Sequence, residues 1–131
     1  MIGIDTNVLV RYVMQDDPAQ ARAATRFLGT LTSQQPGHVS AAVLAELTWV
    51  LKSTYGATRN ELANAVETLL AADSLVVEHA DRAHRALAAL RAAGADFADA
   101  FVAAIDQGAG CAETVTFDKD AARRAGMRLL A

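Results

Sequence analysis

The sequence has little of what marks several large classes of protein. It contains one cysteine, Cys111, so no disulfide can form within the chain, and we expect a reducing compartment and a buried thiol. Its longest apolar stretches are short of the roughly 20 residues that cross a bilayer, and charged residues such as Glu46 interrupt them. There is no signal peptide pattern. We therefore expect a cytoplasmic protein without a membrane segment.

Basic residues are not in excess either. The chain has 12 Lys and Arg against 15 Asp and Glu, a formal net charge of −3, so its composition gives no bulk electrostatic case for binding nucleic acid. Aromatic residues make up only 5% while hydrophobic residues, many of them alanine, make up 53%, which favours closely packed helices over a β-sandwich. The length of 131 residues and the lack of any linker predict a single domain spanning residues 1–131.

Several catalytic and cofactor motifs are also missing. The stretch GAGCAE at 108–113 lacks the third glycine of a dinucleotide fingerprint and precedes a strand instead of following one. There is no G-x-S-x-G turn for a serine nucleophile, and His38, His79 and His84 do not have the spacing of metal ligands. These absences argue against a nucleotide cofactor, a serine hydrolase and a histidine metal site.

What the sequence does contain is an alternation of short apolar strands and longer helices. The opening residues MIGI predict a buried, central parallel strand, and further strands are predicted at 38–39, 74–78, 113–117 and 127–130. Helices are predicted between them, with start signals at Asp17-Pro18, Ser40 and the Thr58 to Glu61 capping box. This alternation predicts an α/β protein, a three-layer α/β/α sandwich around a roughly five-stranded parallel sheet.

Acidic residues recur where the predicted elements meet one edge of that sheet. Asp5 and Asp118 each follow a strand, while Glu46, Asp96 and Asp99 lie early on helices that begin at the same edge. Each acid taken alone is more often a helix cap or a solvated residue, so the case depends on their shared location. Carboxylates held together repel one another unless a cation is bound, and Mg²⁺ or Mn²⁺ prefers oxygen ligands. Such ions activate water and support phosphodiester hydrolysis, so the pattern predicts a nuclease site.

Four stretches resemble the PIN-domain ribonucleases: IDTNVLV at the start, AEL around Glu46, DFADAFVAA around Asp99 and TFDKD around Asp118. Within that family the chain is most similar to VapC-type toxins of toxin–antitoxin pairs. The resemblance implies a Mg²⁺-dependent endoribonuclease that cleaves RNA, forms a homodimer and is inhibited by a cognate antitoxin protein. It implies Asp5, Glu46, Asp99 and Asp118 as the catalytic and metal-binding acids, with Asp96 as a further contributor. Thr6, Asn7 and Thr116 match small polar positions that support these acids.

Two other readings compete with this one. A phosphoaspartyl receiver domain or a phosphatase of the haloacid dehalogenase type also places acids at strand ends, but those phosphatases need a second aspartate where this chain has Asn7. A catalytically inactive PIN-like binding module would lack one of the four acids, and all four are present. Six basic residues are candidates for phosphate contacts, although a solvated helix face is their commoner role: Arg11, Arg22, Arg26, Arg82, Arg85 and Lys119.

Overall fold

The computed structural model describes all residues from 1 to 131, and it contains five short strands and seven helices. In chain order the elements are β1 (Ile2–Gly3), α1 (Thr6–Met14), α2 (Pro18–Gly29), β2 (Gly37–Val39), α3 (Ala41–Ser53), α4 (Arg59–Ala71), β3 (Leu75–Val77), α5 (Ala80–Ala93), α6 (Phe97–Gly108), β4 (Val115–Thr116), α7 (Lys119–Arg124) and β5 (Arg128–Leu129). The predicted α/β class is confirmed.

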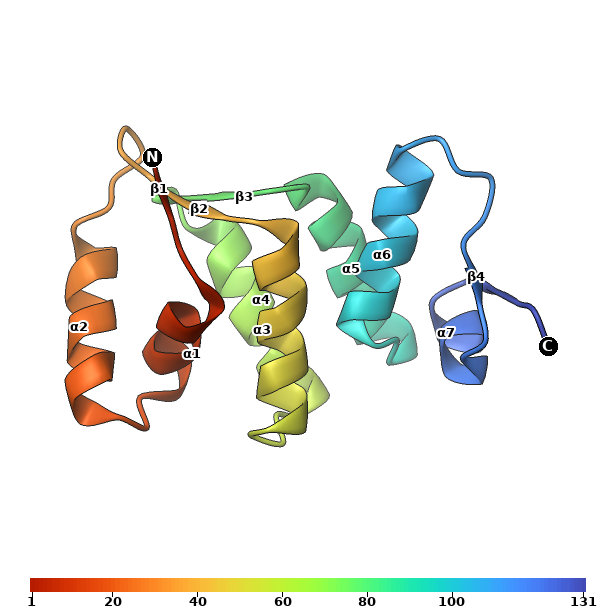
Figure 1. Cartoon of the computed structure of the whole chain (residues 1–131), viewed down its shortest axis with the longest axis horizontal. Helices are drawn as coiled ribbons and strands as arrows, with labels where there is room; N and C mark the ends of the chain where they lie inside the picture. Colours follow the sequence, from red (N-terminus) through yellow and green to blue (C-terminus); the bar gives the residue numbers. More distant parts are fainter.

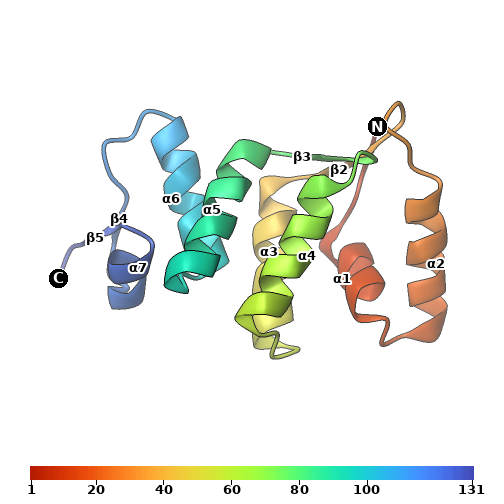
Figure 2. The same ribbon diagram turned by 180° about the vertical axis from the view of Figure 1, so that it is seen from behind.

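The prediction of one five-stranded sheet is wrong. Three strands form a parallel sheet in the order β1-β2-β3, with Ile2 opposite Gly37 and His38 opposite Val76. The strands β4 and β5 form a separate parallel pair. Figures 1 and 2 show why: β1 and β4 lie at opposite ends of the molecule, with helices α3 to α6 between them.

This arrangement also corrects the expectation for the first strand. We expected a central, buried strand, but β1 is an edge strand and Ile2 is 54% exposed. The apolar run MIGI has the composition of a buried strand, yet the partner that would cover its outer edge is absent from this chain's own fold. Glycine at position 37 leaves room for the side chain of Ile4, since a Cβ there would lie 2.5 Å from Cδ1 of Ile4.

The core is built mainly from the apolar faces of the helices. Leu44, Leu47 and Leu51 of α3 are buried, as the helical spacing predicts. Phe97 and Phe101 of α6 are almost fully buried, with ring centroids 5.4 Å apart. Burying a side chain of this size contributes about 1.5–3 kcal/mol. Helix α6 packs on α5 and also contacts α3, so it joins the two ends of the molecule.

Local capping residues explain where the helices begin and end. Thr58 accepts a hydrogen bond from the Glu61 N–H while the Glu61 carboxylate accepts one from the Thr58 N–H, so the predicted capping box is confirmed. Ser40 caps α3, and Gly94 ends α5 in the left-handed conformation at φ +67°. None of the seven helices combines the length and the apolar run that a membrane crossing needs.

Cys111 is not buried as expected. It follows α6 in an exposed turn, where its N–H donates to the carbonyl of Asp106. The preference of free cysteine for the interior is outweighed by the turn that must carry the chain from α6 to β4.

Candidate active site

Two of the predicted acids share a cleft near the start of the chain. Asp5 lies between β1 and α1 and caps that helix, its Oδ1 accepting a hydrogen bond of 2.8 Å from the Thr6 N–H. Glu46 lies in the second turn of α3 and is exposed. Both side chains line a cleft of about 380 Å³. The contact between α1 and α3 brings them together.

The other three acids gather around the start of α6. Asp96 is the N-cap of this helix, and its Oδ2 accepts a hydrogen bond of 3.1 Å from the N–H of Asp99. Burial, and then the charges of Asp96 and Asp118, raise the pKa of Asp99 above its ordinary value. Lys52 of α3 opposes this shift, with its Nζ 3.5 Å from Asp96 Oδ1. A helix start here carries more negative charge than its neighbours neutralise.

Asp118 comes from the last part of the chain and caps α7. Its Oδ1 accepts hydrogen bonds from the N–H groups of Asp120, at 2.8 Å, and Ala121, at 3.1 Å. Its own N–H donates to Oγ1 of Thr116, at 2.9 Å. Thr116 therefore holds the turn that presents Asp118.

The five predicted acids thus form two groups. Asp5 and Glu46 make one, and Asp96, Asp99 and Asp118 make the other. Nowhere do three or more Asp, Glu, His or Cys side chains lie close enough together to hold one metal ion. The convergence expected from the sequence requires all five strands to share one sheet, but β4 and β5 form a separate pair.

The two other supporting residues lie beside Asp5. Asn7 is exposed and lines the clefts on both sides of Asp5. Thr6 is 5% exposed, and its Oγ1 has no hydrogen-bond partner. A buried hydroxyl without a partner costs about 1–3 kcal/mol, so Thr6 lowers the stability of the fold at the start of α1.

A hydrogen-bonded cluster that sequence reasoning missed borders the same clefts. Arg11 donates from Nε to Gln20 Oε1, at 2.7 Å, and from Nη1 to Asp16 Oδ1, at 3.2 Å. The Tyr55 hydroxyl donates to Asp16 Oδ2, at 2.8 Å. That hydrogen bond is the main reason why the pKa of Asp16 is lowered, followed by a hydrogen bond from the backbone N–H of Asp16 and then by the charge and hydrogen bond of Arg11. Arg11 is thereby held in place beside Asp5.

Only part of this cluster could be predicted from the sequence. Arg11 was among the candidates for phosphate contacts, but Asp16 and Tyr55 are 39 residues apart and no local pattern links them. The same applies to Lys52, which reaches Asp96 only because α3 packs on α6.

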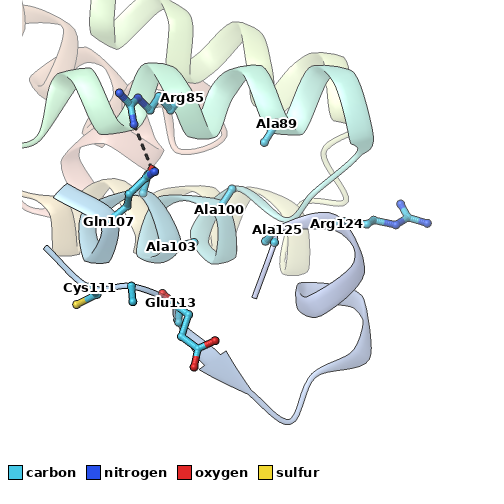
Figure 3. Close-up of a pocket in the computed structure, with 13 residues that line it drawn as sticks. Arg85, Ala89, Ala100, Ala103, Gln107, Cys111, Glu113, Arg124 and Ala125 are labelled. Atoms are coloured by element: carbon cyan, nitrogen blue, oxygen red, sulfur yellow. Dashed lines mark hydrogen bonds between the residues drawn. The ribbon is translucent and has the colours of Figure 1, made fainter. Parts of the chain in front are cut away.

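A further cavity, of about 320 Å³, lies between α5, α6 and the residues that lead into β4 (Figure 3). Arg85 reaches across it to Oε1 of Gln107, at 3.2 Å. Glu113 is the one carboxylate among its lining residues, and it is held by Arg128. This cavity contains none of the predicted acids and no group of side chains that could hold a metal ion.

The carboxylates around Asp5 and Asp99 can therefore supply oxygen ligands, and the basic Arg11 lies where a phosphate could be met. Comparison of the sequence with known protein families identifies the family of this chain. The PIN domain family matches residues 2–127, and the match includes every acid discussed above. No curated protein matches the chain. The chain therefore belongs to the PIN domain family, whose members are generally nucleases.

Proposed function

We propose that this chain is a Mg²⁺-dependent endoribonuclease of a single domain, residues 1–131, and the toxin of a type II toxin–antitoxin pair. What carries the proposal is the group of carboxylates around α6: the pKa of Asp99 is raised by burial and by Asp96 and Asp118, and only Lys52 opposes them. Such a group is unfavourable without a cation and becomes favourable when a divalent ion binds.

The donor chemistry fits that ion. Carboxylate oxygens are the ligands that Mg²⁺ and Mn²⁺ prefer. The residues that would hold the ion are Asp5, Glu46, Asp99 and Asp118, with Asp96 as a helper, once the two groups of acids are brought together. When bound, the ion supplies positive charge that lowers the pKa of water and offsets the negative charge of the phosphodiester.

Residues of the chain orient the metal-binding acids and the RNA phosphates. Asp96 fixes the first turn of α6 through the N–H of Asp99, which sets the direction in which the Asp99 carboxylate points. The turn held by Thr116 does the same for Asp118. Arg11, fixed by Gln20 and Asp16, offers its remaining guanidinium N–H groups to phosphate oxygens. In this proposal the acids bind and orient the metal ion, while Arg11 positions the RNA backbone.

Incubation of the purified protein with total RNA, with and without Mg²⁺, tests the proposal when the new RNA ends are mapped. Asp99→Asn should abolish metal-dependent cleavage, whereas Asp96→Asn should retain cleavage reduced by about 10-fold to 100-fold, because Asp96 acts on a neighbouring ligand. Asp73→Asn, an exposed acid before β3, is the matched control and should cleave as the parent does. Equal cleavage by the parent and Asp99→Asn would contradict the assignment.

The toxin role includes an antitoxin, and charge supports its mode of binding. Asp5, Glu46 and Asp118 are exposed and form no ion pair within the chain. A basic peptide can pair with them, and an arginine can bind a carboxylate through two hydrogen bonds.

The stability of the complex should therefore fall as salt concentration rises, and Glu46→Lys or Asp118→Lys should weaken it. Titration by fluorescence anisotropy or calorimetry measures both effects. An inhibitor indifferent to salt and to both charge reversals cannot bind in this way.

A further inference from the structure

One edge of the three-stranded sheet has no partner. β1 pairs with β2 on one side only, and Met1 and Ile2 on it are 72% and 54% exposed. Beside this edge lies a cleft of about 700 Å³ whose surface is mainly apolar, lined by Ile4, Val8 and Phe27 among others. Unpaired backbone groups next to an apolar cleft form a surface that accepts a strand and its side chains.

At the other end of the molecule, a strand also lacks a partner on one side. Residues 115–130, here called the C-terminal unit, comprise β4, α7 and β5. β4 pairs only with β5, and Val115 and Phe117 are 47% and 74% exposed. A two-stranded sheet is barely stable alone, and parallel strands are normally covered on both faces. The C-terminal unit therefore lacks a neighbouring strand and an apolar cover.

In this arrangement β1 and β4 of the same chain cannot pair with each other. β1 and β4 lie at opposite ends of the molecule in both views (Figures 1 and 2). The link to β4 is tied to α6, because Thr114 Oγ1 donates to Asp106 Oδ2, at 2.8 Å, and the Cys111 N–H donates to the Asp106 carbonyl, at 3.0 Å. Arg124 of the C-terminal unit also donates to the Gly94 carbonyl, at 3.5 Å. A second copy can supply the strand with all of these contacts intact.

We propose that two copies of this chain exchange their C-terminal units, so that β4 of one copy pairs in parallel with β1 of the other and Phe117 enters the apolar cleft beside it. The exchange is reciprocal, and a two-fold interface of this kind closes on itself as a dimer. It leaves neither a free β1 edge nor an uncovered β4.

The exchange also completes the site, an aspect that rests on the proposed function. Neighbouring parallel strands end at the same edge of a sheet, so Asp118, two residues after β4, comes next to Asp5 after β1. Asp96 and Asp99 accompany Asp118, since they lie together around α6. Each active site then combines Asp5 and Glu46 of one copy with the α6 acids of the other.

Cysteine cross-linking tests the exchange without any nuclease assay. In a Cys111→Ser background, Ile2→Cys and Val115→Cys are made as separate proteins, unfolded together and refolded as a mixture. Mild oxidation should give a disulfide-linked dimer that contains one of each, seen on a non-reducing gel. The matched control replaces Val115→Cys with Val76→Cys, a valine of similar exposure on the opposite edge strand β3, and should give no such product.

A third protein that carries both cysteines distinguishes exchange from closure of a single chain. Exchange links this double variant into covalent dimers, whereas closure would give a monomer without free thiols. A monomeric disulfide, or no disulfide at all, would overturn the proposal.

Complementation then tests the shared site. Asp5→Asn and Asp118→Asn, each inactive alone, should recover about one quarter of parental RNA cleavage after mixed refolding, because half of the dimers are mixed and each of these has one intact site of two. No recovery, with an active parent, would contradict the composite site. If the parent itself cleaves no RNA, the proposed function fails while the cross-linking result still decides the exchange.

Discussion

At the scale of single residues, the acids differ in what surrounds them. Asp99 is partly buried and faces Asp96 and Asp118, so its pKa is raised; Asp16 accepts a hydrogen bond from Tyr55 and lies beside Arg11, so its pKa is lowered. Asp99 forms no ion pair, while Asp16 is paired with Arg11. In the proposed function, Asp99 is therefore a candidate metal ligand, whereas Asp16 holds Arg11 in place.

Asp99→Asn should stabilise the metal-free protein at pH 7. The folded-state pKa of Asp99 lies above its ordinary value of 3.8, so its favourable contribution is fully present below that value and is lost as the pH rises through the folded-state pKa. At neutral pH the ionised carboxylate costs stability that asparagine does not. Melting temperatures of both proteins in EDTA should differ at pH 7 and converge below about pH 4. A variant less stable than the parent at pH 7 would contradict this reading.

Tyr55→Phe should raise the pKa of Asp16 towards its ordinary value, because the hydroxyl is the largest cause of the lowered pKa. The sign follows from the hydrogen bond, which favours the ionised form and so contributes stability above the unfolded-state pKa that is lost as the pH falls. An NMR titration of the Asp16 carboxyl measures the shift. Tyr12→Phe is the matched control, and it should leave Asp16 unchanged.

At the scale of elements, helix boundaries are set by neighbours in the sequence. The capping box of α4 satisfies backbone N–H groups through Thr58 and Glu61 alone, and Asp17 with Pro18 starts α2 in the same local way. The strands differ, because a two-residue or three-residue strand exists only when another strand pairs with it.

Thr58→Ala should lower the free energy of unfolding by about 1 kcal/mol, the usual cost of losing an N-cap side chain. Thr68→Ala is the control, since Thr68 is exposed on the same helix and donates only to the carbonyl of Asn64. The control should change stability by about 0.5 kcal/mol or less. Urea denaturation of both variants measures the difference, and equal losses would show that the cap is not what stabilises the start of α4.

At the scale of the whole molecule, folding stability is linked to the binding of a divalent ion. A divalent ion that binds only the folded protein stabilises it by about 2.7 kcal/mol at a free concentration of 100 times the dissociation constant. Mg²⁺ or Mn²⁺ should therefore raise the melting temperature of the parent, and this increase should shrink strongly in Asp5→Asn and in Asp99→Asn. Asp73→Asn should respond as the parent does. A full response in both site variants would place the cation elsewhere.

The sequence by itself determined the features that depend on near neighbours. The start of α4 at Thr58, the end of α5 at Gly94, the apolar faces of α3 and α6 and the α/β class could be predicted, because caps and periodicity act over a few residues.

Only the tertiary structure decided how distant segments meet. It made β1 an exposed edge strand and left Cys111 at the surface. It also divided the acids into one group around Asp5 and another around Asp99. These features depend on strand pairing, which joins residues that no local pattern connects.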